Sequence, residues 1–374
     1  MSFILDKKGQ ILRPTLLLDE KKVRANIQKM VRKARSAGVS IRPHFKTHQS
    51  IEIGRWFRQD GVNSIAVSSL SMAQYFAGDG WDDITVAINV NPNEIDLINT
   101  LAQKVKLTLV LDAPEMVIFL ERSLNHPVNL YIKIDTGNNR TGLLWHKEND
   151  IIQIVRQIDR TKKVRFIGLL THTGQTYRAK SLEKITQFHS ETRTRLLQLQ
   201  MALKQVGFSN CMISDGDTPS CSLFDEFKGI DEIRPGNFVF YDVTQLKLGV
   251  CSAQDIAVAV ACPVIGKYPH RNELVIYGGA IHFSKDYLLD EQGKKIYGYL
   301  TNFDNNQWGV LNESVYLHTL YQEHGKVKAS DAIMEQTKIG DILLFLPIHS
   351  CLTVNLYGHY MTFEGKTITK LIQS

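Results

Sequence analysis

The sequence predicts an α/β fold in which a (β/α)8 barrel is followed by a C-terminal all-β domain. Apolar, β-rich runs alternate with amphipathic helical stretches from about residue 15 to residue 214, and beyond residue 241 strand patterns continue without helices. The length of 374 residues suffices for two domains, and no repeat, low-complexity run or flexible linker interrupts the chain. We expect the barrel at residues 13–244 and the β domain at residues 1–12 plus 245–374.

The barrel prediction depends on eight strand candidates, seven of which are followed by a helical stretch. They lie at residues 15–18, 41–45, 64–67, 84–87, 106–111, 130–134, 164–171 and 211–214. The clearest helical pattern has apolar or small residues spaced by three or four positions: Ile185, Phe188, Thr192, Leu196, Leu199 and Leu203. Strands joined by helical crossovers form parallel sheets. Eight such units in about 200 residues favour a closed barrel over an open sheet.

The C-terminal part has a different pattern. Strand candidates lie at residues 257–265, 273–277, 315–321, 341–346 and 353–357. No helical periodicity is evident between them, which is typical of a separate all-β domain.

The charge of the chain gives no indication of a nucleic-acid partner. Forty-four basic and thirty-eight acidic residues give a net charge of +6, which is scattered except for a basic stretch at residues 21–35. The apolar residues of that stretch fall on one helical face: Val23, Ile27, Met30, Val31 and Ala34. The basic residues are therefore interpreted as the solvated side of an amphipathic helix.

Several absences point to a cytoplasmic protein. No run approaches the roughly 18–20 apolar residues that span a bilayer, so we expect no membrane association. The N-terminal residues lack the features of a secretory signal. The five cysteines are odd in number and contain no CxxC pair, which favours a reducing compartment.

A barrel of this kind carries its chemistry at the carboxyl ends of its strands, and Lys46 follows the second predicted strand. A lysine next to other cations, or removed from water, has a lowered pKa and reacts as a neutral amine. Lys46 is therefore a candidate for Schiff-base chemistry. The alternative is a structural lysine at a strand end, with its ammonium group in solvent.

Other strand ends carry residues suited to binding a cofactor. The segment 216–220 follows the eighth predicted strand and offers backbone N–H groups and hydroxyls to a phosphate, from Gly216, Asp217, Thr218 and Ser220. Arg140 follows the sixth strand, and His172 ends the seventh, where it could lie flat against a planar cofactor, with Tyr177 in the same segment. Each of these residues could equally be part of a structural loop.

The β domain contains a candidate metal site in the segment 347–351. If this segment is a strand, His349 and Cys351 are two positions apart and face the same side. An imidazole and a thiolate are a good ligand pair for Zn²⁺ and leave positions open for water and substrate. The alternative is a buried cysteine beside a hydrogen-bonded histidine.

In this order along the chain, the motifs resemble those of the fold-type III PLP enzymes, the alanine racemase-like group. Within that group the chain resembles the D-threonine aldolase and D-serine dehydratase family. The resemblance covers nearly the whole chain and rests on residues 43–48 (Pro-His-Phe-Lys-Thr-His), Asp135-Thr-Gly with Arg140, His172, 216–220, 234–242 (Arg-Pro-Gly-Asn-Phe-Val-Phe-Tyr-Asp), 322–325 and 349–351.

The resemblance implies roles for these residues. Lys46 would carry pyridoxal 5'-phosphate (PLP) as a Schiff base and exchange the α-proton of the substrate. Arg140 would lie near the phenolic oxygen of the cofactor and His172 near its ring. The phosphate would be held by the 216–220 segment together with Tyr241. His349 and Cys351 would bind a divalent metal, with Zn²⁺ expected and Mn²⁺ as the alternative.

The implied activity is that of a PLP- and metal-dependent lyase acting on β-hydroxy-D-amino acids. Either a dehydratase, forming a 2-oxo acid and ammonia, or an aldolase, forming glycine and an aldehyde, fits; the His–Cys pair favours the D-serine dehydratase branch. The alternatives are an amino-acid racemase of the same fold and a non-catalytic PLP-binding protein. The resemblance also implies a homodimer with shared active sites.

Overall fold

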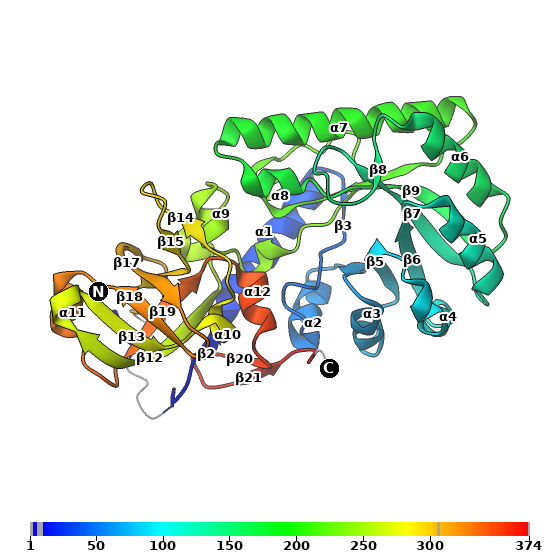
Figure 1. Ribbon diagram of the computed structural model, residues 1–374. Helices are drawn as coiled ribbons and strands as arrows, with labels where there is room; N and C mark the ends of the chain where they lie inside the picture. The colour runs from blue at the N-terminus through cyan, green and yellow to red at the C-terminus, as the bar shows by residue number, and fades with distance from the viewer. Residues whose placement is uncertain (1–2, 6–9, 305–306, 373–374) are drawn as a thin grey trace. The chain divides into compact units, whose positions relative to one another are not determined.

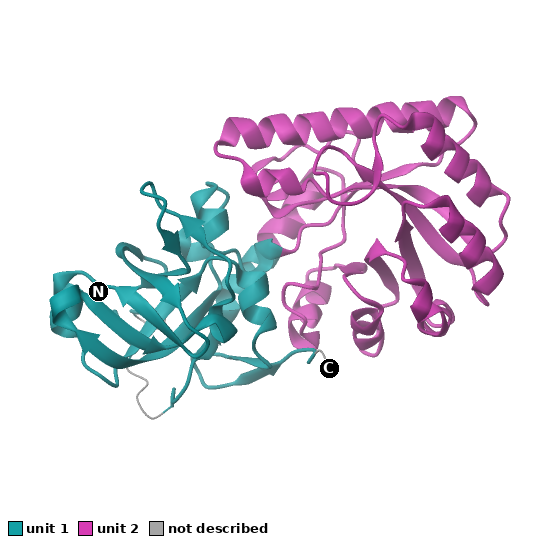
Figure 2. Ribbon diagram, viewed as in Figure 1, with its two compact units in different colours: residues 1–27, 237–374 teal, residues 28–236 magenta. Residues whose placement is uncertain are grey.

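The computed structural model describes residues 3–5, 10–304 and 307–372 (Figure 1). The chain separates into two compact units, Met1–Ile27 with Asn237–Ser374, here called the β unit, and Gln28–Gly236, here called the barrel unit (Figure 2). The domain boundaries expected at residues 13 and 244 refer to independently folding domains, and they stay a prediction. Within the predicted 1–12 segment, residues 1–2 and 6–9 lie outside the described residues.

The barrel unit is built on eight parallel strands that close into a ring. In order around the ring they are β3 (Ser40–Ile41), β4 (Ile65–Val67), β5 (Asp83–Asn89), β6 (Lys106–Leu111), β7 (Val128–Asp135), β9 (Val164–Leu170), β10 (Met212–Asp215) and β11 (Glu232–Ile233). β11 pairs with β3 on one side. The ring closes on the other side because His44, just after β3, pairs in parallel with Ala66 of β4. The short strand β8 (Leu143–Leu144) pairs with β7 outside the ring.

Helices connect the strands of the ring, as parallel pairing requires. They are α2 (Ile51–Gln59), α3 (Leu70–Ala77), α4 (Ile95–Ala102), α5 (Pro114–Ser123), α6 (Glu148–Asp159), α7 (Leu182–Gln205) and α8 (Thr218–Leu223). The predicted apolar spacing of α7 is confirmed, since Ile185, Leu196 and Leu203 are fully buried. Among the described residues, no helix has the length and apolar character needed to cross a membrane.

The predicted architecture is confirmed, but two strand assignments were wrong. The run Thr15–Leu18 is a strand, β2, yet it pairs with β12 (Val258–Tyr268) of the β unit. Three consecutive leucines bury both faces of a strand, so the pattern fits either sheet. The eighth barrel strand is instead Glu232–Ile233, whose two residues are too few to give a recognisable pattern.

The β unit is built on six antiparallel strands that also close into a barrel. β12 pairs with both β13 (Glu273–Tyr277) and β19 (Ile342–Pro347), and the ring is completed by β18 (His324–Lys328), β17 (Leu311–Leu320) and β16 (Gly298–Thr301). β1 (Ile4–Leu5) pairs with β19, whereas β2 pairs with β20 (His359–Met361), which pairs with β21 (Thr367–Thr369). β14 (Leu288–Leu289) and β15 (Lys295–Ile296) form a separate hairpin.

The expectation that the β unit lacks helices was wrong. Short helices occur at α9 (Val243–Lys247), α10 (Ala280–Phe283), α11 (Asp331–Gln336) and α12 (Ser350–Asn355). The last of these replaces the strand expected at residues 353–357. Single 3-10 turns lie in the two units at η1 (Pro92–Glu94), η2 (Gly174–Arg178), η3 (Asn237–Val239), η4 (Ala253–Asp255) and η5 (Pro269–Arg271).

The basic stretch forms the predicted amphipathic helix, α1 (Glu20–Ser36). Its apolar face is buried at Val23, Ile27, Met30, Val31 and Ala34. Two of its lysines are not simply solvated: Lys22 Nζ donates to Trp308 O at 2.7 Å, and Lys33 Nζ donates to Ser222 O at 2.6 Å. These lysines therefore anchor the helix in addition to covering its outer face.

Candidate active site

The predicted cofactor residues of the barrel unit lie at the carboxyl ends of its strands. Lys46 follows β3, Arg140 follows β7, His172 follows β9, and Gly216 follows β10. In a parallel barrel all strands end at the same rim, so these residues share one face of the barrel unit. A direct contact joins two of them, because His172 Nδ1 lies 2.6 Å from Gly216 O.

The residue before Lys46 packs into a cluster of aromatic side chains. The preceding residue, Phe45, is fully buried, and its ring lies 4.9–5.1 Å from three others, those of Phe57, Phe76 and Trp81. In the same turn His48 Nδ1 accepts a hydrogen bond from Ser50 N at 3.1 Å, and burial lowers the pKa of His48 to about 3. The half-buried Lys46 side chain therefore starts from a rigid backbone position.

Four cations gather at this rim: Lys46, Lys133, Arg140 and Arg234. Burial lowers the pKa of His172 to about 3, and the charges of Lys46, Arg140 and Arg234 lower it further, against the effect of its bond to Gly216. Burial also lowers the pKa of Lys133 to about 8, with Arg140 and Arg234 as the next causes. A neutral imidazole among excess positive charge is the environment expected where an anion such as a phosphate or a carboxylate binds.

The pKa of a second histidine, His44, is lowered in the same electrostatic environment. Burial lowers the pKa of His44 well below its usual value, and the charges of Lys46 and Arg234 add to the effect. Smaller contributions come from His172 and Lys133. Because these groups come from four different strand ends, the shift shows that the strand ends converge in space.

The 216–220 segment is a tight turn with an internal hydrogen-bond network. Asp217 caps helix α8, since its Oδ1 accepts from Ser220 N at 2.7 Å and from Thr176 Oγ1 at 3.0 Å. Tyr177 Oη accepts from Thr218 N at 3.1 Å. Residue 216 must be glycine, because a Cβ there would lie 2.4 Å from the backbone nitrogen of Arg234.

Two polar atoms of this segment are suited to a ligand. Among the described residues, Ser220 Oγ and Asp217 Oδ2 are buried and have no hydrogen-bond partner. Such atoms are costly unless a ligand or water satisfies them. Burial, followed by the charge of Asp215, raises the pKa of Asp217 to about 7, so this carboxyl repels a bound anion less than an ordinary aspartate would. The segment therefore fits a phosphate.

The loop that carries Arg140 is fixed at its base and open at its tip. Asp135 Oδ1 accepts from three consecutive backbone N–H groups at 2.8–3.1 Å, those of Gly137, Asn138 and Asn139. Arg140 itself is exposed. The guanidinium therefore extends from a rigid turn and is free to engage a ligand.

In the β unit, His349 and Cys351 come together differently from the prediction. They are not two positions of a strand: His349 is the N-terminal cap residue of α12, and Cys351 lies in the first turn of that helix. The two side chains nevertheless form a hydrogen-bonding contact. His349 Nδ1 also lies 2.7 Å from Asp286 Oδ2, and a carboxylate in this position orients the ring.

A buried carboxylate fixes the start of α12. Asp242 Oδ2 accepts from Ser350 N at 3.0 Å and from Asn237 Nδ2 at 2.7 Å. Asn237 Nδ2 also lies 3.6 Å from Cys351 Sγ. These long-range bonds stabilise a helix start where the local sequence favours a strand, which is the physical reason for the wrong prediction.

The surroundings of His349 are anionic. Burial alone would lower the pKa of His349, but the contact with Cys351 and the carboxylates of Asp242 and Asp286 raise it to about 10. The same anionic neighbours would stabilise a divalent cation, which binds the imidazole only after its proton is released. In the described ranges no group of three or more His, Cys, Asp or Glu side chains could hold a metal.

The predicted site residues divide between the two units. Those in the barrel unit are Lys46, Arg140, His172, Tyr177, Gly216, Asp217, Thr218 and Ser220. Those in the β unit are Tyr241, His349 and Cys351. Tyr241 is buried and has a left-handed backbone, with φ 49°, directly before Asp242.

The structure adds residues to which the sequence reasoning assigned no role. In the barrel unit these are His44, Lys133 and Arg234, and in the β unit Asn237, Asp242 and Asp286. Lys133 could have been found, since it precedes Asp135 by two positions on the same strand and so faces the same side. Asp286 could not, because its role depends on a contact 63 residues away along the chain.

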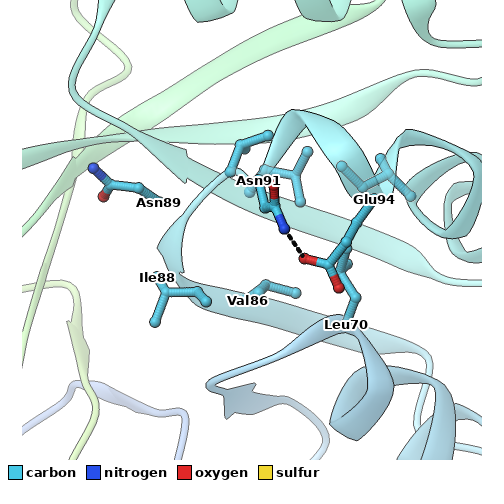
Figure 3. A pocket seen from close by; sticks show the side chains of 9 residues that line it. Leu70, Val86, Ile88, Asn89, Asn91 and Glu94 are labelled. Atoms are coloured by element: carbon cyan, nitrogen blue, oxygen red, sulfur yellow. Dashed lines mark hydrogen bonds between the residues drawn. The ribbon is translucent and has the colours of Figure 1, made fainter.

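A small pocket of the barrel unit is lined by other residues than the predicted site residues (Figure 3). It lies at the end of β5 and is lined mainly by apolar side chains, including Leu70, Val86 and Ile88. Its acidic residue, Glu94, accepts a hydrogen bond from Asn91 at 3.1 Å. None of the predicted site residues lines it.

Comparisons with known proteins match both parts of the chain. The family model "Alanine racemase, N-terminal domain" matches residues 18–243, and the model "Putative serine dehydratase domain" matches residues 257–363. The predicted alanine racemase-like fold and the resemblance to fold-type III PLP enzymes are confirmed.

Several characterised relatives align over most of their length. The chain is 29% identical to a D-serine dehydratase of Dictyostelium discoideum, covering 93% of this chain and 92% of that protein. It is 28% identical to the D-threo-3-hydroxyaspartate dehydratase of Delftia sp. (strain HT23), covering 94% of each. A D-threonine aldolase of Arthrobacter sp is 23% identical over 63% of each chain.

A solved structure of the Delftia sp. HT23 dehydratase superposes with a TM-score of 0.90 at 26% identity, covering 99% of this chain and 100% of that one. A variant of that enzyme, solved in a metal-free form, superposes equally well, with a TM-score of 0.90 at 26% identity, covering 99% of this chain and 100% of that one.

Proposed function

Because this chain belongs to the alanine racemase N-terminal domain family, we propose that it is a PLP- and divalent-metal-dependent lyase that acts on β-hydroxy-D-amino acids. The observation that carries the proposal is the position of Lys46 at the end of a barrel strand, among Lys133, Arg140 and Arg234. The dehydratases and aldolases among the relatives support the reaction class.

The barrel unit would hold the cofactor. Lys46 would bind it covalently, Arg140 would approach its phenolic oxygen, and His172 its ring. Ser220 Oγ and the backbone N–H groups of the 216–220 segment would bind its phosphate, with Tyr177 of the same unit. Tyr241, which belongs to the β unit, is a further residue proposed to bind the cofactor. PLP, when bound, supplies an electron sink for the electron pair left when the substrate loses its α-proton.

Lys46 would then remove the α-proton of the substrate. A lysine performs this step only as the neutral amine. His172 is neutral at pH 7 and so adds no charge at the ring that it would face. The cations left over would bind the α-carboxylate of the amino acid.

The β unit would hold the metal through His349 and Cys351. Zn²⁺ suits an imidazole–thiolate pair, and Mn²⁺ is the alternative. The ion would act as a Lewis acid on the β-hydroxyl of the substrate. Asp286 would orient the His349 ring, and Asp242 would fix the backbone on which both ligands stand.

Dehydration is favoured over aldol cleavage. Two relatives at 29% and 28% identity are a D-serine dehydratase and a D-threo-3-hydroxyaspartate dehydratase, whereas the D-threonine and 3-hydroxy-D-aspartate aldolases are 23–24% identical, the latter over 95% of this chain. The proposal further includes a homodimer with shared active sites and a cytoplasmic location. The odd number of cysteines, five, with no CxxC pair supports a reducing compartment.

The test is an incubation of the purified protein with D-threonine, PLP and either Zn²⁺ or Mn²⁺, followed by analysis of the products. We expect ammonia and 2-oxobutanoate. Glycine and acetaldehyde as products would identify an aldolase instead of a dehydratase. Inversion at Cα without cleavage would indicate a racemase. Bound PLP with no turnover of any hydroxy-D-amino acid would contradict the lyase proposal altogether.

A further inference from the structure

A chain of hydrogen-bonded charges runs through the interior of the eight-stranded barrel. At the solvent end, Lys106 Nζ donates to Asp83 Oδ2 at 2.8 Å, and Asp83 Oδ1 accepts from Arg42 Nη1 at 2.6 Å. Deeper inside, Arg42 Nε donates to Glu232 Oε2 at 2.6 Å. Lys106 and Asp83 are the first residues of their strands, so the chain begins at the amino end of the barrel.

The chain of hydrogen-bonded charges continues to the opposite rim of the barrel. Ser214 Oγ donates to Glu232 Oε1 at 2.5 Å and accepts from Arg234 Nη1. The other terminal nitrogen of Arg234, Nη2, donates to Thr171 O, immediately before His172. Arg234 is 5% exposed, so this scaffold and not solvent fixes the direction of its guanidinium.

The interior of such a barrel is ordinarily filled by layers of apolar side chains. A buried ion pair such as Arg42–Glu232 is weak evidence for stability, because desolvation of both charges offsets their attraction. What such a pair does provide is a fixed orientation for the groups hydrogen-bonded to it. The group at the end of this chain, Arg234, lies among the cations that perturb His44, His172 and Lys133.

We infer that Glu232 and Ser214 are positioning residues that act on the candidate active site through Arg234. Glu232 and Arg234 are two positions apart at the end of β11, and Ser214 on the neighbouring strand joins them. Arg42 fixes the carboxylate of Glu232 from the amino end of the barrel. Ser214 bonds to both Glu232 and Arg234, and so fixes the Arg234 guanidinium relative to that carboxylate. Arg234 thereby points at a fixed place on the carboxyl rim. This inference rests on the proposed PLP site at that rim.

The test compares Ser214→Ala with Ser214→Thr in the PLP-bound protein. Ser214→Ala removes the bridging hydroxyl but leaves the Arg42–Glu232 pair intact, whereas Ser214→Thr keeps a hydroxyl at the same position. We expect Ser214→Ala to lower kcat about tenfold with KM changed less than about twofold, and to shift the absorption maximum of bound PLP. Ser214→Thr should restore the absorption maximum and most of kcat.

Two further variants separate positioning from stability. Lys106→Ala breaks only the solvent end of the chain and should leave kcat and the absorption maximum unchanged. Combining Ser214→Ala with Glu232→Gln should cost no more than the larger single effect, because both act through Arg234.

The inference is overturned if Ser214→Ala leaves kcat and the spectrum unchanged, or if it lowers only the melting temperature. It is equally overturned if Lys106→Ala has the same effect, or if the two inner substitutions are additive. A wild-type protein that binds no PLP would refute the proposed function itself, which is a different outcome.

Discussion

His172 and His349 occupy opposite electrostatic environments, although both were predicted as site residues. In the barrel unit, burial and neighbouring cations lower the pKa of His172 to about 3. In the β unit, burial is outweighed by the Cys351 contact and by the carboxylates of Asp242 and Asp286, which raise the pKa of His349 to about 10. Burial lowers the pKa of both rings, and the anionic neighbours of His349 reverse the direction of its shift.

This contrast fits the proposed division of tasks between the units. The barrel rim, with four cations and orphaned donors such as Ser220 Oγ, suits the phosphate of a cofactor and the carboxylate of a substrate. The segment around His349 suits a metal cation. The predictions that follow either remove one side of this contrast or measure it.

The largest effect is expected for Lys46→Ala, which removes the reactive amine from the barrel rim. Activity toward D-serine or D-threonine should fall by at least about 10³-fold, since no other group replaces the nucleophile and base. Steady-state kinetics with added PLP measure this loss. Lys104→Ala, at an exposed position, is the matched control and should behave as wild type. Full activity in the Lys46→Ala variant would contradict the proposed role of Lys46 in binding PLP and removing the α-proton.

In the β unit, the variants His349→Ala and Cys351→Ala should lose metal binding while PLP binding is kept. Both variants should keep the absorption of bound PLP but lose about 10²-fold or more in turnover, because the β-hydroxyl is no longer activated. Metal content per chain, measured after dialysis, should fall in parallel. His359→Ala changes an exposed histidine of the same unit and should keep both metal and turnover. Unchanged metal content in the first two variants would exclude this ligand pair.

A smaller effect is expected for Asp286→Asn, which weakens the partner of His349 Nδ1. Loss of such a carboxylate commonly lowers metal affinity about 10–100-fold. Competition with a chelator, followed by assay of remaining turnover, measures the change, and Glu291→Gln serves as the control at an exposed acid nearby. Equal metal affinity in the two variants would show that Asp286 does not support the site.

The smallest effect concerns stability against pH. The pKa of His48 is lowered to about 3 in the folded chain, against about 6.5 when unfolded, so between these values only the unfolded chain takes up the proton. Stability should therefore fall as the pH decreases from 7 to 5, by up to about 2 kcal/mol for one such histidine. Urea unfolding at several pH values measures this. His48→Asn, which can still accept from Ser50 N, should flatten the dependence; an equally steep slope would assign it to other groups.

The sequence predicted the fold and the strand-end residues for a physical reason, namely that alternating strands and helices fix which ends share a rim. Lys46, His172 and Gly216 follow from that rule. What depends on distant contacts was missed: β2 pairs across more than two hundred residues, and the start of α12 depends on Asp242. The selection of His349 and Cys351 as a ligand pair stays a prediction, but the strand geometry expected for them was wrong.

The identity of the lysine that binds PLP tests the central claim most directly. Reduction of the PLP-loaded protein with borohydride, followed by peptide mapping, locates the modified residue. We expect the phosphopyridoxyl group on Lys46, in the peptide that contains residues 43–48. Lys133 is the informative competitor, since burial lowers its pKa to about 8 at the same rim. Modification of Lys133 instead of Lys46, or no modified lysine at all, would contradict the account.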